Sequence, residues 1–307
     1  MSTPASRATG SLLGLAVADA LGGAVEFRPR HDLDRAFPQG VREITGGGPH
    51  RLDPGEYTDD THMALAIARA ATPGGIDFNQ VAANYVGWYR SGPKDIGIAT
   101  ANALSLIASG VPWHEAGERL QARSVDGVAG NGTIMRCAPV ALRFPHDRPA
   151  RESAAIETSR MTHADPRATW GAVALTNAVA HLVNGGSRDD LVAAAIDGVP
   201  ETRVVAAIVD APAMTRDQVR SGGYVLDTLG AAFWSVLGTE SAEEAIVTAV
   251  SLGDDADTTG AVAGALAGAL CGEDALPGRW LAVLQDRDEI RALALRLFDW
   301  GSTGELA

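Results

Sequence analysis

Two short acidic segments carry the side chains in this sequence that are best suited to chemistry. The first, GEYTDDTHMALA, has a hydroxyl and paired carboxylates at residues 58–60, and the second, GDDADTTGAVAGALAG, has three aspartates and two threonines at 254–259. Each segment precedes an apolar stretch with helical spacing, so each places oxygen atoms at the start of a helix. One such residue is enough to cap a helix. Several carboxylates brought together in the interior would repel one another unless a cation compensates.

Six side chains from these segments form the predicted metal ligands: Thr58, Asp59, Asp60, Asp255, Asp257 and Thr258. Hard oxygen donors without sulfur or imidazole favour Mg²⁺, Mn²⁺ or Ca²⁺ over zinc or copper. Four carboxylates match the charge of two divalent cations, and a pair of such ions is a recurrent means of orienting a substrate and activating water. The pattern therefore predicts a binuclear site. The alternative is two independent sets of helix caps.

Other candidate groups are weaker on pattern alone. A Gly-Asn-Gly turn in GVAGNGTIMRCAPVAL precedes an apolar helix, so its backbone N–H groups could bind phosphate, although most such turns are only turns. His163 lies at a helix junction, where a histidine is more often structural, and the histidines show no metal-ligand spacing. Tyr224 either stacks on a base or ribose or, as slightly favoured, anchors a helix. Asp19 and Glu26 read as solvated carboxylates.

The elements that must position these groups are helices. Apolar residues recur at helical spacing along most of the chain, and convincing alternating strands are missing. The sequence predicts an all-α fold, a single compact bundle of more than ten helices formed by residues 1–307, with the binuclear metal site at its centre. Gly260, Gly264 and Gly268 fall four residues apart. Because each glycine costs about 1 kcal/mol of helix propensity, the spacing predicts close helix packing that brings the two acidic segments together.

Composition excludes several classes of partner. The chain has a formal net charge of −13 and no cluster of lysine or arginine, which predicts no nucleic-acid groove. The apolar run 260–271 is shorter than the roughly 20 residues that cross a bilayer, so no membrane partner is expected. Cys137 and Cys271 lie in apolar runs without metal or redox spacing, which predicts buried thiols in a reducing compartment. We expect a cytoplasmic protein that is a monomer.

Taken in order, six segments strongly resemble the ADP-ribosylglycohydrolase family: VADALGGAVEF, GEYTDDTHMALA, GNGTIMR, THADP, GGYVLDTLGAAFW and GDDADTTGAVAGALAG. That family is all-helical with two Mg²⁺ or Mn²⁺ ions, and the resemblance implies that the six predicted ligands hold them, with Glu26 as a mobile acidic residue nearby. It also implies the residues that contact ADP-ribose. The pyrophosphate and ribose would lie along Gly130, Asn131, Gly132 and Thr133, with Met135, His163 and Tyr224 close by.

The resemblance implies a divalent-metal-dependent hydrolase that cleaves the glycosidic bond between ADP-ribose and an acceptor, with Glu26, Asp60 and Asp255 as catalytic residues. Arginine is favoured as the acceptor over serine or a small ADP-ribose ester, because the motifs resemble the bacterial glycohydrolases. The chain departs from the family at Asp254, where members commonly have glycine, and at Tyr57, where they have tryptophan. The alternatives are an ADP-ribose-binding protein without efficient turnover and a crystallin-like structural protein.

Overall fold

The computed structural model describes residues 2–302, which form sixteen α-helices and a short antiparallel hairpin that pairs Ala71 with Ile76 and Thr72 with Gly75. The expected all-α fold is confirmed, since 63% of the chain is helical. The bounds are α1 Pro4–Gly22, α2 Arg30–Ala36, α3 Asp59–Arg69, β1 Ala71–Thr72, β2 Gly75–Ile76, α4 Phe78–Arg90, α5 Ile98–Ala108, α6 Trp113–Gln121, α7 Ala138–Arg143, α8 Arg148–Arg160, α9 Pro166–Val183, α10 Leu191–Ile196, α11 Thr202–Asp210, α12 Val225–Leu237, α13 Ala242–Val250, α14 Ala256–Cys271, α15 Gly278–Val283 and α16 Arg287–Ser302.

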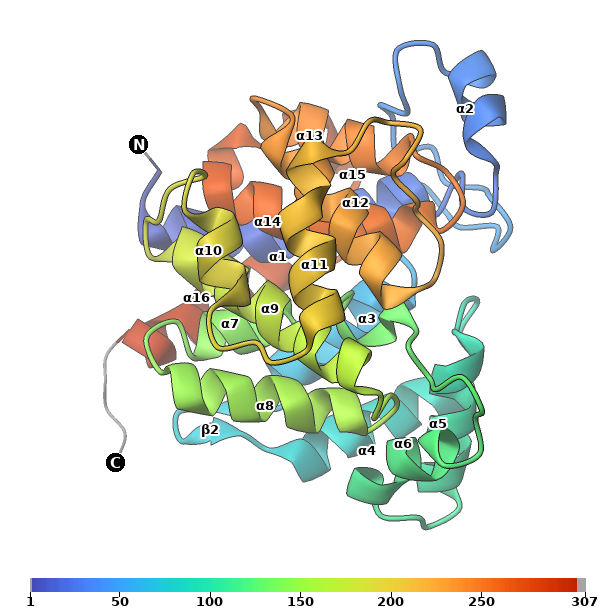
Figure 1. Ribbon diagram of the computed structural model, residues 1–307, viewed down its shortest axis with the longest axis vertical. Helices are drawn as coiled ribbons and strands as arrows, with labels where there is room; N and C mark the ends of the chain where they lie inside the picture. The colour runs from blue at the N-terminus through green and yellow to red at the C-terminus, as the bar shows by residue number, and fades with distance from the viewer. Residues whose placement is uncertain (1, 303–307) are drawn as a thin grey trace.

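Helices α1 and α14 form the centre of the bundle, and the other helices surround them (Figure 1). Every residue of α1 from Ala8 to Gly22 is buried, and so is every residue of α14 from Ala256 to Ala269. A helix that is buried on all sides must be small or apolar on all sides. This explains why both helices consist mostly of Ala, Gly, Val and Leu.

The glycines of α14 pack against α1. A Cβ atom added to Gly14 would collide with the carbonyl oxygen of Gly264, and one added to Gly264 would collide with the carbonyl oxygen of Gly14. In the same way, a Cβ atom added to Gly10 would collide with the carbonyl oxygen of Gly268, and one added to Gly268 with that of Gly10. The predicted close helix packing is therefore present. The glycines pack against α1, which also carries Asp19.

A glycine-rich loop joins α2, which projects from the bundle in Figure 1, to the start of α3. Gly46, Gly47 and Gly48 have φ values of 66°, 89° and 68°, a region that residues with a side chain rarely adopt. A Cβ atom on Gly48 would also collide with the carbonyl oxygen of Gly23, just after α1. The three consecutive glycines therefore let this loop fold back onto the end of α1.

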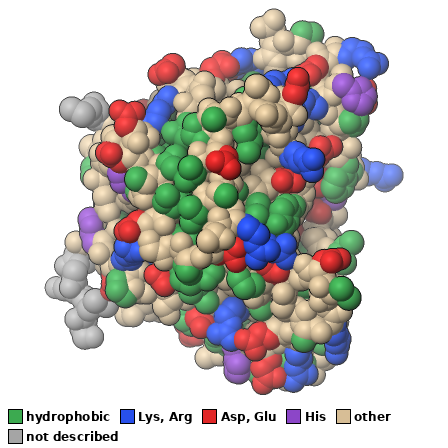
Figure 2. All heavy atoms as spheres, viewed as in Figure 1, with side chains coloured by type: hydrophobic (Ala, Val, Ile, Leu, Met, Phe, Trp, Pro, Cys, Tyr) green, Lys and Arg blue, Asp and Glu red, His purple; other side chains and the backbone are tan. Residues whose placement is uncertain are grey.

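Acidic and basic side chains are interspersed over the face shown in Figure 2, around a strip of hydrophobic side chains. Within the part of the chain that the structure describes, no helix combines the length and hydropathy that crossing a membrane requires. Cys137 is buried as expected, whereas Cys271 is only partly buried. The prediction for Cys271 was wrong because the last turn of α14 reaches the surface of the bundle.

Candidate metal centre and substrate cavity

Asp19 of α1 holds the start of α3. Its Oδ1 atom accepts hydrogen bonds from the N–H and hydroxyl groups of Thr58 at 2.9 and 2.8 Å, and its Oδ2 atom accepts from the same two groups of Thr61 at 3.0 and 2.5 Å. These bonds satisfy N–H groups that have no partner within the helix. Asp19 is fully buried, so its interpretation as a solvated carboxylate was wrong. Burial raises its pKa to about 6, against the opposing effect of the threonine hydrogen bonds.

The two acidic segments meet at Asp60. Its Oδ2 atom accepts hydrogen bonds from the hydroxyl of Thr58 at 3.2 Å and from the hydroxyl of Thr258, far away in the sequence, at 3.3 Å. Its Oδ1 atom is buried and has no hydrogen-bond partner within residues 2–302. Burial, and then the charge of Asp19, raise the pKa of Asp60 well above its usual value. A buried carboxylate oxygen without a partner is costly, and a bound cation would remove that cost.

The remaining acidic ligands surround Asp60. Asp257 accepts a hydrogen bond from the N–H of Thr258 at 2.8 Å, and Asp59 accepts one from the N–H of Gly97 at 3.2 Å. Burial raises the pKa of Asp257 well above its usual value and that of Asp59 to about 7, with neighbouring carboxylates adding to both shifts. One oxygen each of Glu26, Asp255 and Asp257 lies within 4.8 Å of the others. Glu26 is buried here, so it too is not a solvated carboxylate.

The structure thus places the six predicted ligands close together, and we define the acidic centre as those six residues with Glu26. Two observations fit a divalent cation there: the unsatisfied Asp60 oxygen and the crowding of buried carboxylates that lack a counter-charge. The donor set consists of oxygen atoms, as Mg²⁺ and Mn²⁺ prefer. The role of each residue as a ligand, and the number of ions, remain predictions.

A cavity of about 470 Å³ opens onto this centre, a size typical of small-molecule sites. Its acidic wall is formed by Glu26, Asp59, Asp95, Asp255 and Asp257. The rest of the lining is largely apolar or glycine. Five of the seven residues predicted to contact ADP-ribose belong to it: Gly130, Asn131, Gly132, Met135 and His163. The lining also includes Phe27, Ile96, Gly97, Ile98, Ala99, Thr100, Gly223 and Thr258.

Asn131 ties the Gly-Asn-Gly turn to the acidic centre. Its side-chain amide donates to Asp255 at 2.8 Å and to the hydroxyl of Thr228 at 3.0 Å. A Cβ atom on Gly130 or Gly132 would approach the ring of His163 to 3.0 or 2.8 Å, which explains why small residues flank Asn131. Gly130 and Gly132 therefore expose backbone beside the carboxylates, where a ligand could contact it closely.

His163 lies beneath this turn and is neutral. Its Nδ1 atom is 2.8 Å from the hydroxyl of Thr162. Burial, and then the charge of Arg136, lower the pKa of His163 to about 3. Arg136 is itself buried and donates to the carbonyl of Thr158 and the hydroxyl of Thr162, so its partners are not carboxylates. A neutral ring gives the cavity floor a polar surface without a charge.

Two residues predicted to contact the substrate, Thr133 and Tyr224, are not among the described residues that line the cavity. Thr133 is buried, and its hydroxyl donates to the carbonyl of Ala168 at 2.8 Å, so it points into the bundle. Tyr224 is 37% exposed, precedes α12 and has the guanidinium of Arg167 over its ring at 5.6 Å from the centroid. Their roles in binding remain predictions.

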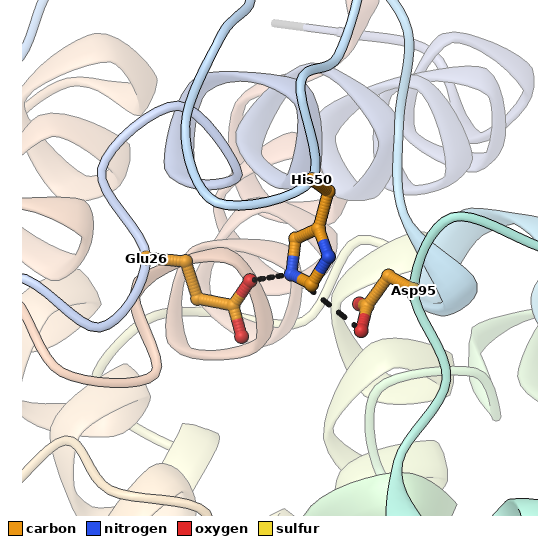
Figure 3. A group of neighbouring side chains, drawn as sticks. All are labelled: Glu26, His50 and Asp95. Carbon is orange, nitrogen blue, oxygen red and sulfur yellow. Dashed lines mark hydrogen bonds and ion pairs between the residues drawn. The ribbon is translucent and has the colours of Figure 1, made fainter.

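Sequence reasoning missed His50 and Asp95, which meet Glu26 at the edge of the cavity (Figure 3). The Nε2 atom of His50 is 2.7 Å from Oε2 of Glu26 and 3.6 Å from Oδ1 of Asp95. These residues come from three separate segments, so no local spacing marks them. The available signals were a glycine-rich loop around His50 and an acid ahead of a helix at Asp95, as in both acidic segments.

Comparisons with known proteins identify the family of the chain. The family model for ADP-ribosylglycohydrolase matches residues 1–305. The chain is 38% identical over 303 residues to ADP-ribosylarginine hydrolase Tri1 of Pseudomonas putida (strain GB-1), covering 95% of this chain and 78% of that protein. It is 33% identical to the ADP-ribosyl-dinitrogen reductase glycohydrolase of Rhodospirillum rubrum over 92% of each chain. A solved structure titled ADP-ribosylglycohydrolase-related protein complex has a TM-score of 0.83 and 36% identity, covering 98% of this chain and 100% of that chain. The chain therefore belongs to the ADP-ribosylglycohydrolase family.

Proposed function

We propose that this protein hydrolyses the glycosidic bond that joins ADP-ribose to a modified arginine, using divalent cations in the acidic centre. The observation that carries the proposal is the unsatisfied, buried oxygen of Asp60 in a carboxylate cluster that opens directly onto a ligand-sized cavity. Arginine is favoured over serine or an ester because the relatives that match over nine-tenths of this chain include an ADP-ribosylarginine hydrolase. The ADP-ribosylhydrolase ARH3 of Xenopus tropicalis matches only 60% of it, at 26% identity.

Thr58, Asp59, Asp60, Asp255, Asp257 and Thr258 would hold two Mg²⁺ or Mn²⁺ ions. When bound, such ions supply positive charge that orients ribose hydroxyls and lowers the pKa of water. The protein itself must position the acids that act on the substrate. Asn131 does this for Asp255, which lines the cavity, because its amide donates to one oxygen of that carboxylate at 2.8 Å.

In the proposed reaction, water attacks the anomeric carbon of the distal ribose while the bond from that carbon to the guanidinium nitrogen breaks. Positive charge develops on the sugar, and the carboxylates of Asp255 and Asp60 stabilise it. Glu26 lies where the acidic centre meets the cavity, so it transfers the proton that the attacking water loses to the leaving guanidine nitrogen. Burial, and then the charge of Asp255, raise the pKa of Glu26 to about 8, which suits proton transfer near neutral pH.

The proposal is tested with the double variant Asp255→Ala, Asp257→Ala. We expect loss of ADP-ribose release and loss of divalent-metal binding, measured by a release assay on arginine-, serine- and ester-linked ADP-ribose and by titration calorimetry with Mn²⁺. The matched control is Asp189→Ala, Asp274→Ala, which removes two exposed aspartates and the same charge. Turnover that survives in the first variant would rule out this centre. Release from serine-linked substrate alone would change the assigned acceptor.

A further inference from the structure

The side chain of His50 lies at the cavity edge against Glu26 and has no part in the proposed reaction. It is 13% exposed and is held at both ring nitrogens. Nδ1 lies 3.2 Å from the carbonyl oxygen of Lys94. Because a carbonyl can only accept, Nδ1 carries a proton in this contact. Nε2 faces Glu26, so a single proton lies between the imidazole and the carboxyl group, whichever of the two holds it.

Glu26 lies among other carboxylates, and the charge of Asp255 disfavours its ionised form. Its carboxylate lies within 4.8 Å of oxygen atoms of Asp255 and Asp257, and like charges at that separation push each other apart. The backbone beside Glu26 is anchored, since the N–H of Phe27 donates to the carbonyl of Asp254 at 2.7 Å. That bond fixes the chain but not the Glu26 side chain, whose direction depends on what its oxygens contact.

We propose that His50 is a positioning residue for the reaction: through Nε2 it holds the Glu26 carboxyl group at the junction of the cavity and the acidic centre. This inference rests on the proposed function, in which Glu26 carries the proton. His50 is not among the described residues that line the cavity, so it acts on the substrate through Glu26. The glycine-rich loop gains a role as well, since its conformation at Gly46, Gly47 and Gly48 delivers the ring to this position.

Three substitutions separate the hydrogen bond to Glu26 from the other contacts of His50. His50→Phe keeps a ring against Phe27, whose centroid lies 6.0 Å away, but removes both nitrogens. His50→Gln places an amide nitrogen about where Nε2 stands. His50→Asn reaches only as far as Nδ1, so it can retain the contact with Lys94 but not the one with Glu26. The Gln and Asn variants differ by one methylene and have the same polarity.

We expect His50→Phe and His50→Asn to lower kcat by about ten- to hundredfold, the usual effect of losing a hydrogen bond to a charged group. The KM for ADP-ribosylated arginine should stay within about threefold, because the ground-state contacts of the substrate are retained. His50→Gln should recover most of kcat. In a Glu26→Gln background, His50→Phe should cause no further loss, since His50 acts through Glu26.

The control is His181→Asn, which removes a comparable contact, Nε2 to the carbonyl of Ser187 at 2.9 Å, on a distant helix. Wild-type kcat in His50→Phe and His50→Asn would overturn the inference, as would an undiminished effect of His50→Phe in the Glu26→Gln background. If His50→Phe does not fold, the Gln and Asn pair decides. Wild-type protein without turnover on any ADP-ribose linkage would overturn the proposed function, and this inference with it. Turnover that is unchanged in the His50 variants would overturn this inference alone.

Discussion

Asp254 has a left-handed backbone, with φ at 55°, and an exposed side chain that lies outside the acidic centre. Its N–H donates to the carbonyl of Arg28 at 2.9 Å, and its carbonyl accepts from the N–H of Phe27 at 2.7 Å. These two bonds fasten the Glu26 segment to the start of α14, and neither uses the carboxylate. At this position, where the chain departs from the family pattern, the backbone and not the carboxylate makes these contacts.

We accordingly predict that Asp254→Gly raises the free energy of unfolding by about 0.5 to 1 kcal/mol, because glycine adopts positive φ without the steric cost that a Cβ atom carries. Turnover and metal affinity should stay within about twofold of wild type. Urea unfolding and the release assay measure the two effects. Asp254→Ala is the control, since alanine retains the steric cost. A loss of metal affinity in Asp254→Gly would place the carboxylate in the centre.

His163 predicts a pH dependence of stability. Its pKa of about 3 in the folded protein lies below the value of about 6.5 in an unfolded chain. Between these values the unfolded chain binds a proton that the folded protein does not, so stability falls as the pH decreases below about 6.5. His163→Gln removes this contribution. Between pH 6 and 4, the free energy of unfolding of the variant should fall less steeply than that of wild type. The difference is up to about 1.4 kcal/mol per pH unit. Denaturant unfolding at several pH values tests this, and parallel curves would contradict it.

At the scale of elements, the contact between α1 and α14 positions the acidic centre. Gly22, at the end of α1, excludes any side chain because its Cβ atom would collide with the backbone of Asp257, a predicted ligand. The same helix carries Asp19, which fixes the start of α3. One helix thus sets the distance between both acidic segments. A small shift of α1 against α14 would move the two halves of the centre apart.

We predict that Gly264→Ala lowers the free energy of unfolding by about 1 to 3 kcal/mol, the usual cost of overpacking, and weakens metal binding. The matched control is Gly87→Ala in α4, where a Cβ atom would meet nothing within 4 Å. That change should stabilise the protein by roughly 0.5 to 1 kcal/mol through helix propensity. Thermal unfolding and Mn²⁺ titration measure both. Equal effects of the two substitutions would argue against close contact at Gly264.

The same elements show how far the sequence could be read. Helical periodicity predicted the fold class, and the glycine spacing predicted a tight helix contact, because both are local patterns imposed by burial. The acidic residues at the starts of α3 and α14 could also be predicted, because they too form local patterns in the sequence. Asp19, His50 and Asp95 were not, since each matters through partners on other segments. A buried aspartate within an apolar helix differs from a surface one only by what packs against it.

For the whole molecule, the acidic centre places charge in the middle of a bundle whose two central helices are otherwise small and apolar. Burial raises the pKa of Asp60 and Asp257 well above the usual value, which means that their charged forms are costly in the absence of a cation. The chain thus gives up stability at the site to keep the donors in place. Bound cations should return that stability, since anything that binds only the folded state stabilises it.

We therefore predict that Asp257→Asn has opposite effects with and without divalent ions. In EDTA the variant should be more stable than wild type by about 1 to 3 kcal/mol, because it removes a buried charge beside Asp60. With Mg²⁺ at about a hundred times its Kd, wild type should gain about 2.7 kcal/mol, and the variant much less. Thermal unfolding in EDTA and in MgCl₂ measures the crossing, with the exposed Asp189→Asn as the control. If Asp257→Asn were the less stable protein in EDTA, the hydrogen bond from Thr258 to Asp257 would outweigh the repulsion, and the centre would be stable without a cation.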